Sequence, residues 1–306
     1  RPSIGHASLS SSRVHPRRNL APAIMTSIII PAHNEANVIR RCLDAMTQGA
    51  EPGELEILVV CNGCTDNTAE VARSYAPLVT VLESEIPSKN AALNLGHVQA
   101  TSYPRFYVDA DIVMPLESIR RTASVLTGGK IHGAAPQIRV DLEGRGWPIR
   151  AYYNVWLRTP YVEKGMLGSG VYAISEEGGS RFTTFPEIIA DDGFARLLFE
   201  PEERLTVEDA WFLMTPPETL RSLIHINVRR RVGRFEMAEL HPETTKGEAK
   251  HQRGALYRLF ANPTLWPGLA VYLYAKVACM AIYFVRERQG RHKEWNRDDT
   301  SRKARH

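Results

Sequence analysis

Two aspartates one residue apart, Asp109 and Asp111, are the side chains in this sequence most suited to chemistry. They follow a short apolar run, 106–108, and Pro115 comes soon after them. Two carboxylates held this close at the end of a strand repel each other unless a cation lies between them. Mg²⁺ and Mn²⁺ are hard cations that bind one or two carboxylates together with substrate phosphates. An Asp-x-Asp pair also occurs in solvated turns, so its meaning depends on the rest of the chain.

Polar residues follow two other apolar runs in the same half of the chain. The β-branched run 26–31 ends in a proline and is followed by Asn34 and Glu35, and the run 56–60 leads to Asn62. In a parallel α/β sheet, ligands bind at the carboxyl ends of the strands. We therefore expect these polar residues and the two aspartates to meet at one rim of a sheet.

The elements that must position these residues alternate between strand and helix. Strands are expected at 26–31, 56–60, 79–82 and 106–108, with amphipathic helices between them. This alternation predicts a parallel α/β sheet flanked by helices. The second half is less regular, and the expected strands there are 138–140, 171–175 and 203–207, with helices at 149–157 and through 194–198.

Taken together, the motifs resemble those of the family 2 glycosyltransferases, which have the GT-A fold. The resemblance covers roughly 25–234 and follows the family's order in Ile30-Pro31-Ala32-His33-Asn34-Glu35, Asn62-Gly63-Cys64-Thr65-Asp66-Asn67-Thr68, Lys89-Asn90-Ala91-Ala92-Leu93-Asn94, Asp109-Ala110-Asp111 and Asp191-Asp192. It implies a Rossmann-like, mostly parallel central sheet flanked by helices. It also implies an inverting enzyme that moves a sugar from a nucleotide-diphosphate donor to an acceptor hydroxyl, in the synthesis of cell-surface polysaccharide or glycolipid.

The resemblance also implies a role for each motif. Asp111 would bind Mg²⁺ or Mn²⁺ at the donor diphosphate, and Asp109 would hold the ribose or the metal through water. Asp192 would be the general base for the acceptor hydroxyl, with Asp191 as the alternative. The nucleotide sugar would be bound by these two metal-site aspartates together with Pro31, Ala32, Asn34, Glu35, Asn62, Lys89, Ala110, Gly168, Ser169, Gly170, Arg231 and Arg234.

The second motif departs from the family's pattern. The family usually has an Asp at or just before the position of Asn62, where it helps to hold the nucleobase, and this chain has Cys61-Asn62. Because an amide both donates and accepts hydrogen bonds, uracil is not implied. Cys61 and Cys64 also form a Cys-x-x-Cys pattern, but a zinc site would need two more ligands at a compatible spacing. The four cysteines of the chain suit a reducing compartment.

The positive charge of the chain lies at its two ends. Residues 1–24 and 286–306 each carry a net charge of +4, so the body between them carries −4. A slightly acidic body argues against a nucleic-acid-binding core. Residues 1–24 are rich in Ser, Pro and Arg, and we expect them to be disordered.

An apolar segment, 265–285, is long enough to span a membrane. Lys276 near its middle and Pro267 near its start oppose spanning, and the basic residues after it suit the cytoplasmic face of the cell membrane. A spanning helix, a helix lying in the membrane plane and a helix packed on the body all stay open. A lipid-linked acceptor would explain membrane association, and a carbohydrate acceptor is the alternative.

We therefore expect a leader at 1–24, a GT-A domain at 25–260, and a hydrophobic helix with a basic tail at 261–306. Two other functions stay open. One is a nucleotidyltransferase that makes sugar nucleotides on a related sheet, although that class has a Gly-rich stretch with Arg and Lys after its first strand, where this chain has 32–35. The other is a membrane-tethered module that binds a nucleotide sugar without turnover. Retaining chemistry would leave Asp192 without a base's role.

Overall fold

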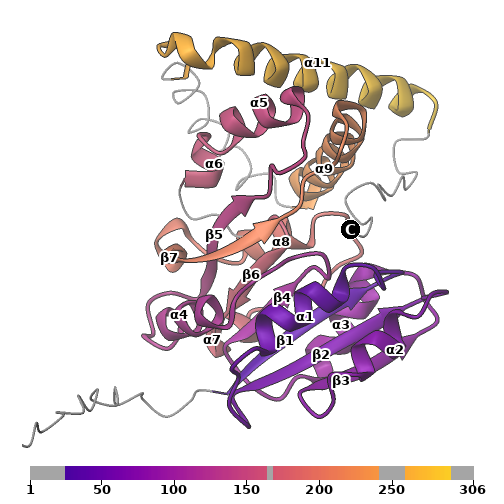
Figure 1. Ribbon diagram of the computed structural model, residues 1–306, viewed down its shortest axis with the longest axis vertical. Coiled ribbons are helices and arrows are strands. Elements are labelled where there is room, and N and C mark those ends of the chain that lie inside the picture. Colours follow the sequence, from indigo (N-terminus) through magenta and orange to yellow (C-terminus); the bar gives the residue numbers. More distant parts are fainter. Residues whose placement is uncertain (1–24, 164–167, 241–258, 291–306) are drawn as a thin grey trace, which may run out of the picture.

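The computed structural model describes residues 25–163, 168–240 and 259–290. Its centre is a seven-stranded sheet in the order β3-β2-β1-β4-β6-β5-β7 (Figure 1). The pairings among the first four strands are all parallel, which confirms the expected parallel core. These strands are β1 (Thr26–Ala32), β2 (Leu55–Asn62), β3 (Val79–Ser84) and β4 (Arg105–Val108), each slightly longer than its apolar run.

One strand in the second half of the sheet, β6, runs antiparallel to its neighbours. β6 (Val171–Ile174) runs antiparallel to both β4 and β5 (Gly133–Val140), and β5 pairs in parallel with β7 (Arg204–Met214). Because β6 is reversed, the loop before it lies at the carboxyl end of β4. There the Asp109 amide donates a hydrogen bond to the Gly170 carbonyl at 2.8 Å.

Helices cover both faces of the sheet, because successive side chains of a strand point to opposite sides. Ile28 and Ile30 belong to one core with the apolar faces of α1 (Ile39–Thr47), α2 (Thr68–Arg73) and α4 (Leu116–Leu126). Ile29 lies on the other face with Ala92 and Leu93 of α3 (Lys89–Gln99). The helices expected between the early strands are therefore confirmed.

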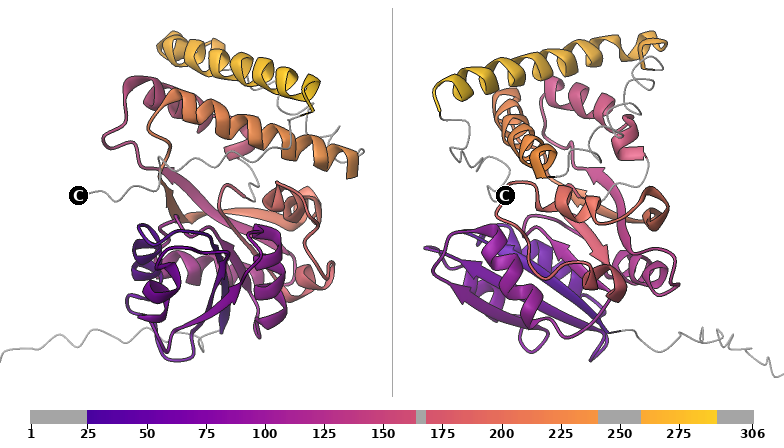
Figure 2. Two further views of the ribbon diagram at one scale, coloured as in Figure 1. Left: turned by 90° about the vertical axis from the view of Figure 1, so that its right-hand side faces the viewer. Right: turned by 180° about the vertical axis from the view of Figure 1, so that it is seen from behind.

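A second layer of helices lies over one end of the sheet. In Figures 1 and 2, α11 (Trp266–Arg288) lies across α5 (Trp147–Trp156) and α9 (Leu220–Leu240), and it packs against both. The inner face of α11 is buried at helical spacing, at Gly268, Leu269, Tyr272, Ala275, Cys279 and Tyr283. A Cβ at Gly268 would lie 3.0 Å from the Ala151 carbonyl of α5, so glycine permits this close packing.

The length of α9 was not expected from the sequence. Arg231 and Arg234 were predicted only as ligands of the nucleotide sugar, but they lie within a helix of 21 residues. Leu223, Ile224, Val228 and Val232 are buried and fall at helical spacing. The arginines between them masked this periodicity.

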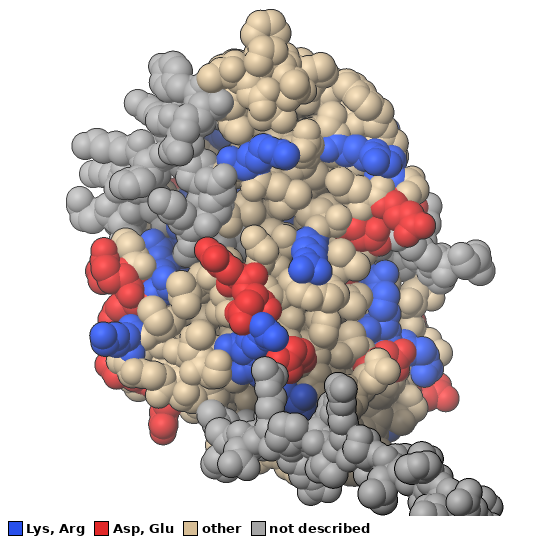
Figure 3. Space-filling view, turned by 60° about the vertical axis from the view of Figure 1, so that its left-hand side comes forward, with Lys and Arg blue, Asp and Glu red and all other residues tan. Residues whose placement is uncertain are grey.

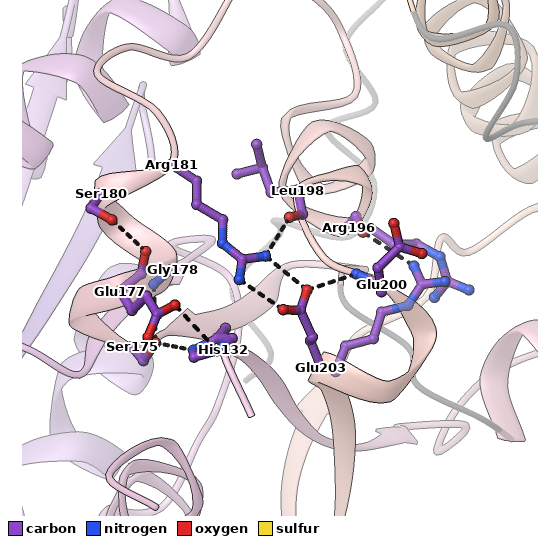
Figure 4. A network of polar contacts seen from close by, with 11 residues as sticks. His132, Ser175, Glu177, Gly178, Ser180, Arg181, Arg196, Leu198, Glu200 and Glu203 are labelled. Carbon is purple, nitrogen blue, oxygen red and sulfur yellow. Dashed lines mark hydrogen bonds and ion pairs between the residues drawn. The ribbon is translucent and has the colours of Figure 1, made fainter. Parts of the chain in front are cut away.

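The short helix α8 (Asp191–Leu197) is held at its C-terminal end by two arginines (Figure 4). Arg181 donates to the Leu198 carbonyl at 3.0 Å and binds both carboxylate oxygens of Glu203 at 2.7 Å. Arg204 donates to the Arg196 carbonyl at 3.1 Å. These contacts satisfy carbonyls that a helix end leaves without partners, and they fix the helix that begins with Asp191.

The remaining described elements are connectors: α6 (Pro160–Glu163), α7 (Glu176–Ser180), η1 (Pro201–Glu203) and η2 (Pro263–Leu265). The expected disorder of residues 1–24 and most of the basic tail after α11 fall outside the described residues. The division of the chain at residue 260 stays a prediction.

The close packing of α3 on β1 makes a prediction at Gly96. A Cβ there would lie 2.5 Å from Ile29 Cγ2 and 3.3 Å from Val60 Cγ2. We expect Gly96→Ala to lower the free energy of unfolding by about 1–3 kcal/mol, the usual cost of overpacking. Urea denaturation measures it, with Gly128→Ala as the control because its nearest neighbour atom is 3.8 Å away. An unchanged midpoint for Gly96→Ala would contradict the packing.

Candidate active site

One cavity of about 750 Å³ lies where β1 and β4 end, and it extends to α9 and α11. Most of the predicted site residues line it, although they come from distant parts of the chain. These are Pro31, Lys89, Asp109, Asp111, Ser169, Gly170, Asp191, Asp192, Arg231 and Arg234. The convergence expected from the strand ends is therefore present around the aspartates.

Lys89 lies at the centre of the acidic part of the cavity. Its Nζ is 2.8 Å from Asp109 Oδ1 and 2.9 Å from Asp191 Oδ1. Ser88 positions it, because the Ser88 hydroxyl accepts a hydrogen bond from the Ala91 amide and begins α3. Burial would lower the pKa of Lys89, but the two carboxylates raise it above its ordinary value. Lys89 is therefore a permanent cation that joins β4 to α8.

Asp191 is buried, and burial, together with the nearby carboxylates of Asp192 and Asp109, raises the pKa of its carboxyl to about 6 against the opposing effect of Lys89. The side chain of Asp191 points back to Lys89, so its role in this structure is to hold the lysine.

Asp192 lies beside Asp191 but has different partners. Its Oδ2 accepts the Ser169 amide at 3.0 Å, and its Oδ1 accepts the Gly193 amide at 2.8 Å. Gly168 has a φ of +123°, and a Cβ there would lie 2.6 Å from Asp192 Oδ2. Only glycine therefore fits this approach, and Gly168 acts by positioning Asp192. Ser169, with a φ of +62°, completes the same turn.

Asp109 and Asp111 present hard oxygen ligands to the cavity. Among the described residues, no group of three or more His, Cys, Asp or Glu side chains could hold a metal ion by itself. Two carboxylates alone fit Mg²⁺ or Mn²⁺ when substrate phosphates complete the coordination. Asp109 Oδ1 is paired with the Lys89 ammonium, and both aspartates line the same cavity. The residues present therefore fit a divalent ion that is bound jointly with a phosphate ligand.

The residues predicted to contact the nucleoside connect two loops. Asn34, with a φ of +53°, accepts the Thr65 amide at 2.7 Å on its Oδ1. The Glu35 amide donates to Thr68 Oγ1 at 2.8 Å, and His33 Nδ1 lies 2.6 Å from the Asn62 carbonyl. Asn34, Glu35 and Asn62 join the ends of β1 and β2, and with Ala32 and Ala110 they lie outside the cavity lining. Their contact with a nucleoside stays a prediction.

Cys61 and Cys64 occur in the structure as free thiols in this same junction. Cys64 Sγ donates to the Ala32 carbonyl at 3.3 Å. A hydrogen bond from Cys61 lowers the pKa of Cys64, against the effect of burial. The pair therefore fastens β2 to the loop after β1.

Two asparagines of α3 hold the chain before α8, a role that the sequence analysis missed. Asn90 Nδ2 donates to the carbonyls of Pro186 and Ile188 at 2.9 and 2.7 Å. Asn94 Oδ1 accepts the Phe185 amide at 2.6 Å. The signal was the placement of polar amides within the motif 89–94, beside buried Ala92 and Leu93. These bonds set the position of Asp191 and Asp192 relative to Lys89.

The predicted arginines lie on α9 at the far side of the cavity. The guanidinium of Arg231 packs over the rings of Phe235 and Tyr283, at 5.2 and 5.5 Å from their centroids. Arg234 also lines the cavity. The cavity therefore has an acidic part at the ends of β1 and β4 and a basic part between α9 and α11.

Residues 27–176 match the family model described as glycosyl transferase family 2. Glycosyltransferase AglE of Haloferax volcanii is 36% identical over 107 residues, which cover 33% of this chain and 35% of that protein. The undecaprenyl-phosphate 4-deoxy-4-formamido-L-arabinose transferase of Pseudomonas savastanoi pv. phaseolicola is 29% identical over 139 residues, covering 42% of this chain and 40% of that protein. The matches therefore span less than half the length of these curated relatives.

Solved structures share the fold over most of the chain. The mannosyltransferase PcManGT from Pyrobaculum calidifontis, in complex with GDP-Man and Mn²⁺, is similar with a TM-score of 0.59 at 24% identity, covering 92% of this chain and 84% of that one. TarS 1–349 of S. aureus has a TM-score of 0.52 at 17% identity, covering 90% and 93%. These likenesses confirm the expected GT-A fold.

The bridge made by Lys89 leads to a prediction about Asp191. We expect Lys89→Met to raise the pKa of the Asp191 carboxyl above about 6, because the lysine opposes the effect of burial. Carbon-13 NMR titration of the carboxyl measures it, with the exposed Lys130→Met as the control. A pKa above the usual 3.8 means that the folded state retains a proton that the unfolded state has lost. The free energy of unfolding should therefore fall as pH rises through this window, and the fall should extend to higher pH in Lys89→Met.

An unchanged pKa of Asp191 in Lys89→Met would contradict the bridge. Asp191→Asn provides a second control, because this variant should lose the dependence of unfolding on pH in the same window.

Proposed function

We propose that this protein, whose residues 27–176 match the model of glycosyl transferase family 2, transfers a sugar from a nucleotide-diphosphate donor to an acceptor hydroxyl. The product would be a cell-surface polysaccharide or glycolipid. The observation that supports this most is the meeting of Asp109, Asp111 and Asp192 in one cavity, with Lys89 between the strand end and α8. We take 25–260 as the catalytic domain and 261–306 as the membrane-facing part.

The donor diphosphate would lie against Asp109 and Asp111. A divalent cation there, Mg²⁺ or Mn²⁺, supplies positive charge to the leaving diphosphate when it is bound. Arg231 and Arg234 would add charge from α9. The nucleoside would lie toward Pro31, which lines the cavity, and toward the loop junction of Asn34, Glu35 and Asn62. The Mn²⁺ and GDP-Man bound to PcManGT are consistent with this arrangement.

Asp192 is the proposed general base. Two backbone amides fix its carboxylate in the cavity wall, whereas Asp191 is occupied by Lys89. The acceptor hydroxyl gives its proton to Asp192 as its oxygen bonds to the anomeric carbon, and the nucleoside diphosphate leaves from the opposite side. This single displacement inverts the anomeric configuration.

Two other functions can be distinguished from this one by the product that is released. A nucleotidyltransferase would release pyrophosphate, and a binding module would release nothing. The loop after β1 has Asn34 joined to the β2 loop instead of a Gly-rich stretch with Arg and Lys, which disfavours the first. A retaining enzyme would not need Asp192 as a base.

The assignment of Asp192 and Asp111 is tested by a pair of variants. We expect Asp192→Asn to reduce turnover by about 10²–10⁴-fold, the usual contribution of a general base, while donor binding is retained. Asp111→Asn should instead abolish the part of donor binding that depends on Mn²⁺. Release of nucleoside diphosphate and thermal shifts with UDP-, GDP- and dTDP-sugars measure the two effects.

Glu187→Gln is the matched control, because Glu187 is exposed close to α8 and lies outside the cavity lining. Full turnover in Asp192→Asn would overturn its role as the base. Donor binding by the unchanged protein that is equally tight with and without Mn²⁺ would overturn the metal site.

The helix α11 supports contact with a membrane. The segment Pro263–Arg288 has a window of mean hydropathy 1.7, only 33% of which is buried in the fold. Its outer face exposes Trp266, Tyr274, Val277, Phe284 and Val285. In Figure 3 the top of the molecule, where α11 lies, shows no Lys, Arg, Asp or Glu among the described residues of this face.

We propose that α11 lies in the plane of the membrane surface. Its inner face packs along α5 and α9, and a spanning helix would have to give up these contacts. Arg286 and Arg288 at its end suit the anionic cytoplasmic surface. The relative named as an undecaprenyl-phosphate transferase is consistent with an acceptor on a lipid.

Charges on the outer face of α11 should weaken membrane binding. We expect Val277→Asp with Phe284→Asp to reduce flotation with vesicles of phosphatidylcholine and phosphatidylglycerol by at least about tenfold, because burying each apolar side chain is worth about 1.5–3 kcal/mol. Val98→Asp on α3 is the control, as Val98 is 71% exposed on another surface. Equal flotation of all three proteins would contradict the in-plane contact.

A further inference from the structure

Arg41 joins three parts of the fold that meet beside Asp111. It lies on α1, and its Nη2 donates to the Asp111 carbonyl and to the Thr215 hydroxyl, at 3.3 Å in each case. These two partners are 70 and 174 residues further along the chain. Asp111 and Thr215 both line the cavity, whereas Arg41 does not. The guanidinium therefore connects two cavity-lining residues from outside the cavity.

The backbone brings the same two residues together. Val113 and Leu213 form an antiparallel bridge, in which each amide donates to the other's carbonyl, at 3.1 and 2.8 Å. Asp111 is two residues before this bridge and Thr215 is two residues after it, so antiparallel register brings them toward one another. Pro216 follows and restricts the residue before it to extended backbone. The position of Thr215 beside Asp111 is therefore fixed by backbone as well as by Arg41.

The Thr215 hydroxyl has a proton that the protein does not use. A hydroxyl can donate one hydrogen bond and accept two, and this one accepts from Arg41. Among the residues that the structure describes, none accepts a hydrogen bond from it. Thr215 is only 7% exposed, and the surface that it does expose belongs to the cavity wall. An oxygen of a molecule bound in the cavity would supply the missing acceptor.

The charge next to this hydroxyl favours an anionic oxygen. A hydroxyl that accepts a hydrogen bond from a cation becomes a stronger donor itself. Within the described ranges Arg41 forms no ion pair, and its Nε is buried without a hydrogen-bond partner. The carboxylates of Asp109 and Asp111 would repel an anion, but the divalent cation proposed above reverses this effect and is bound together with a diphosphate. A phosphate oxygen of the donor is therefore the acceptor that fits.

We propose that Thr215 donates a hydrogen bond to an oxygen of the donor diphosphate, and that Arg41 is a positioning residue that orients and polarises this hydroxyl. Both roles rest on the proposed function, since the donor is that of the same reaction. Arg41 acts through Thr215 and contacts no ligand itself.

The hydroxyl is tested by calorimetric titration of the full chain with UDP, GDP and dTDP, each with and without Mn²⁺. Thr215→Val keeps the shape of the side chain but removes the hydroxyl. We expect it to weaken binding of the preferred nucleotide by about tenfold or more, the loss expected for a hydrogen bond to a charged group. Thr215→Ser is the matched control, because it keeps the hydroxyl and should bind almost as tightly as the unchanged protein. Equal losses in the two variants would assign the effect to the threonine methyl and overturn the proposal.

A double-mutant cycle tests the role of Arg41. Arg41→Gln alone should weaken nucleotide binding by about two- to tenfold, the range of one ordinary hydrogen bond. It should add little in the Thr215→Val background, because Arg41 acts through the hydroxyl. Arg40→Gln is the control, since Arg40 is exposed on the same helix and lies outside the cavity lining. Additive losses would show that Arg41 acts independently of Thr215 and would overturn its positioning role.

The titrations without Mn²⁺ distinguish a phosphate contact from a metal contact. The loss in Thr215→Val should be equal with and without Mn²⁺, whereas Asp111→Asn should remove only the part of binding that depends on Mn²⁺. A loss in Thr215→Val that is confined to the titrations with Mn²⁺ would assign the hydroxyl to the metal and overturn the proposal.

The same samples separate this proposal from the glycosyltransferase proposal. If the unchanged protein and Thr215→Val bind a nucleotide equally well, the role of Thr215 is overturned and the glycosyltransferase proposal stands. If the unchanged protein binds no nucleotide, the glycosyltransferase proposal fails, and the role of Thr215 fails with it. Urea midpoints of all variants show whether a loss of binding reflects a loss of folding.

Discussion

The site depends on one ammonium group placed between two carboxylates. Lys89 connects Asp109, at the end of a central strand, to Asp191, at the start of a helix about a hundred residues later. Without this cation, three neighbouring carboxylates, those of Asp109, Asp191 and Asp192, would repel one another in a partly buried wall. The bridge leaves Asp192 free to point into the cavity, where the Ser169 and Gly193 amides orient it. Asp191 is therefore paired with the lysine, whereas the adjacent Asp192 faces the cavity.

The first half of the fold could be predicted from the sequence because its signals are local. Short β-branched runs such as Ile28-Ile29-Ile30 are buried on both faces, and the polar loops after them mark the carboxyl ends. The antiparallel direction of β6 could not be predicted, since it follows from pairing with β4 and β5 and not from the composition of 171–174. Helix α9 carries a helical pattern of buried residues, but its arginines obscured it.

Some features of the candidate site could likewise be predicted from the sequence, and others could not. Asp109, Asp111, Asp191 and Asp192 could be identified because their motifs are short and contiguous. The contacts of Asn90 and Asn94 with the chain before α8 join segments more than ninety residues apart, and the polar amides within 89–94 do not show which segment they bind. The place of Lys276 in the cavity lining could not be predicted either, because it depends on how α11 lies across α5 and α9. In the sequence, the lysine only interrupts an apolar segment and opposes spanning.

The placement of α11 would also set a minimum distance between the membrane surface and the site. An α-helix with its side chains is about 10–12 Å across, so α11, if it lies flat as proposed, would keep Asp192 at least this far behind the membrane surface. An acceptor anchored in that surface would then reach Asp192, the proposed base, only if its sugar lies at that depth. A hydroxyl further along a growing chain would pass beyond the base. The thickness of one helix would then decide which step of a stepwise assembly this enzyme performs.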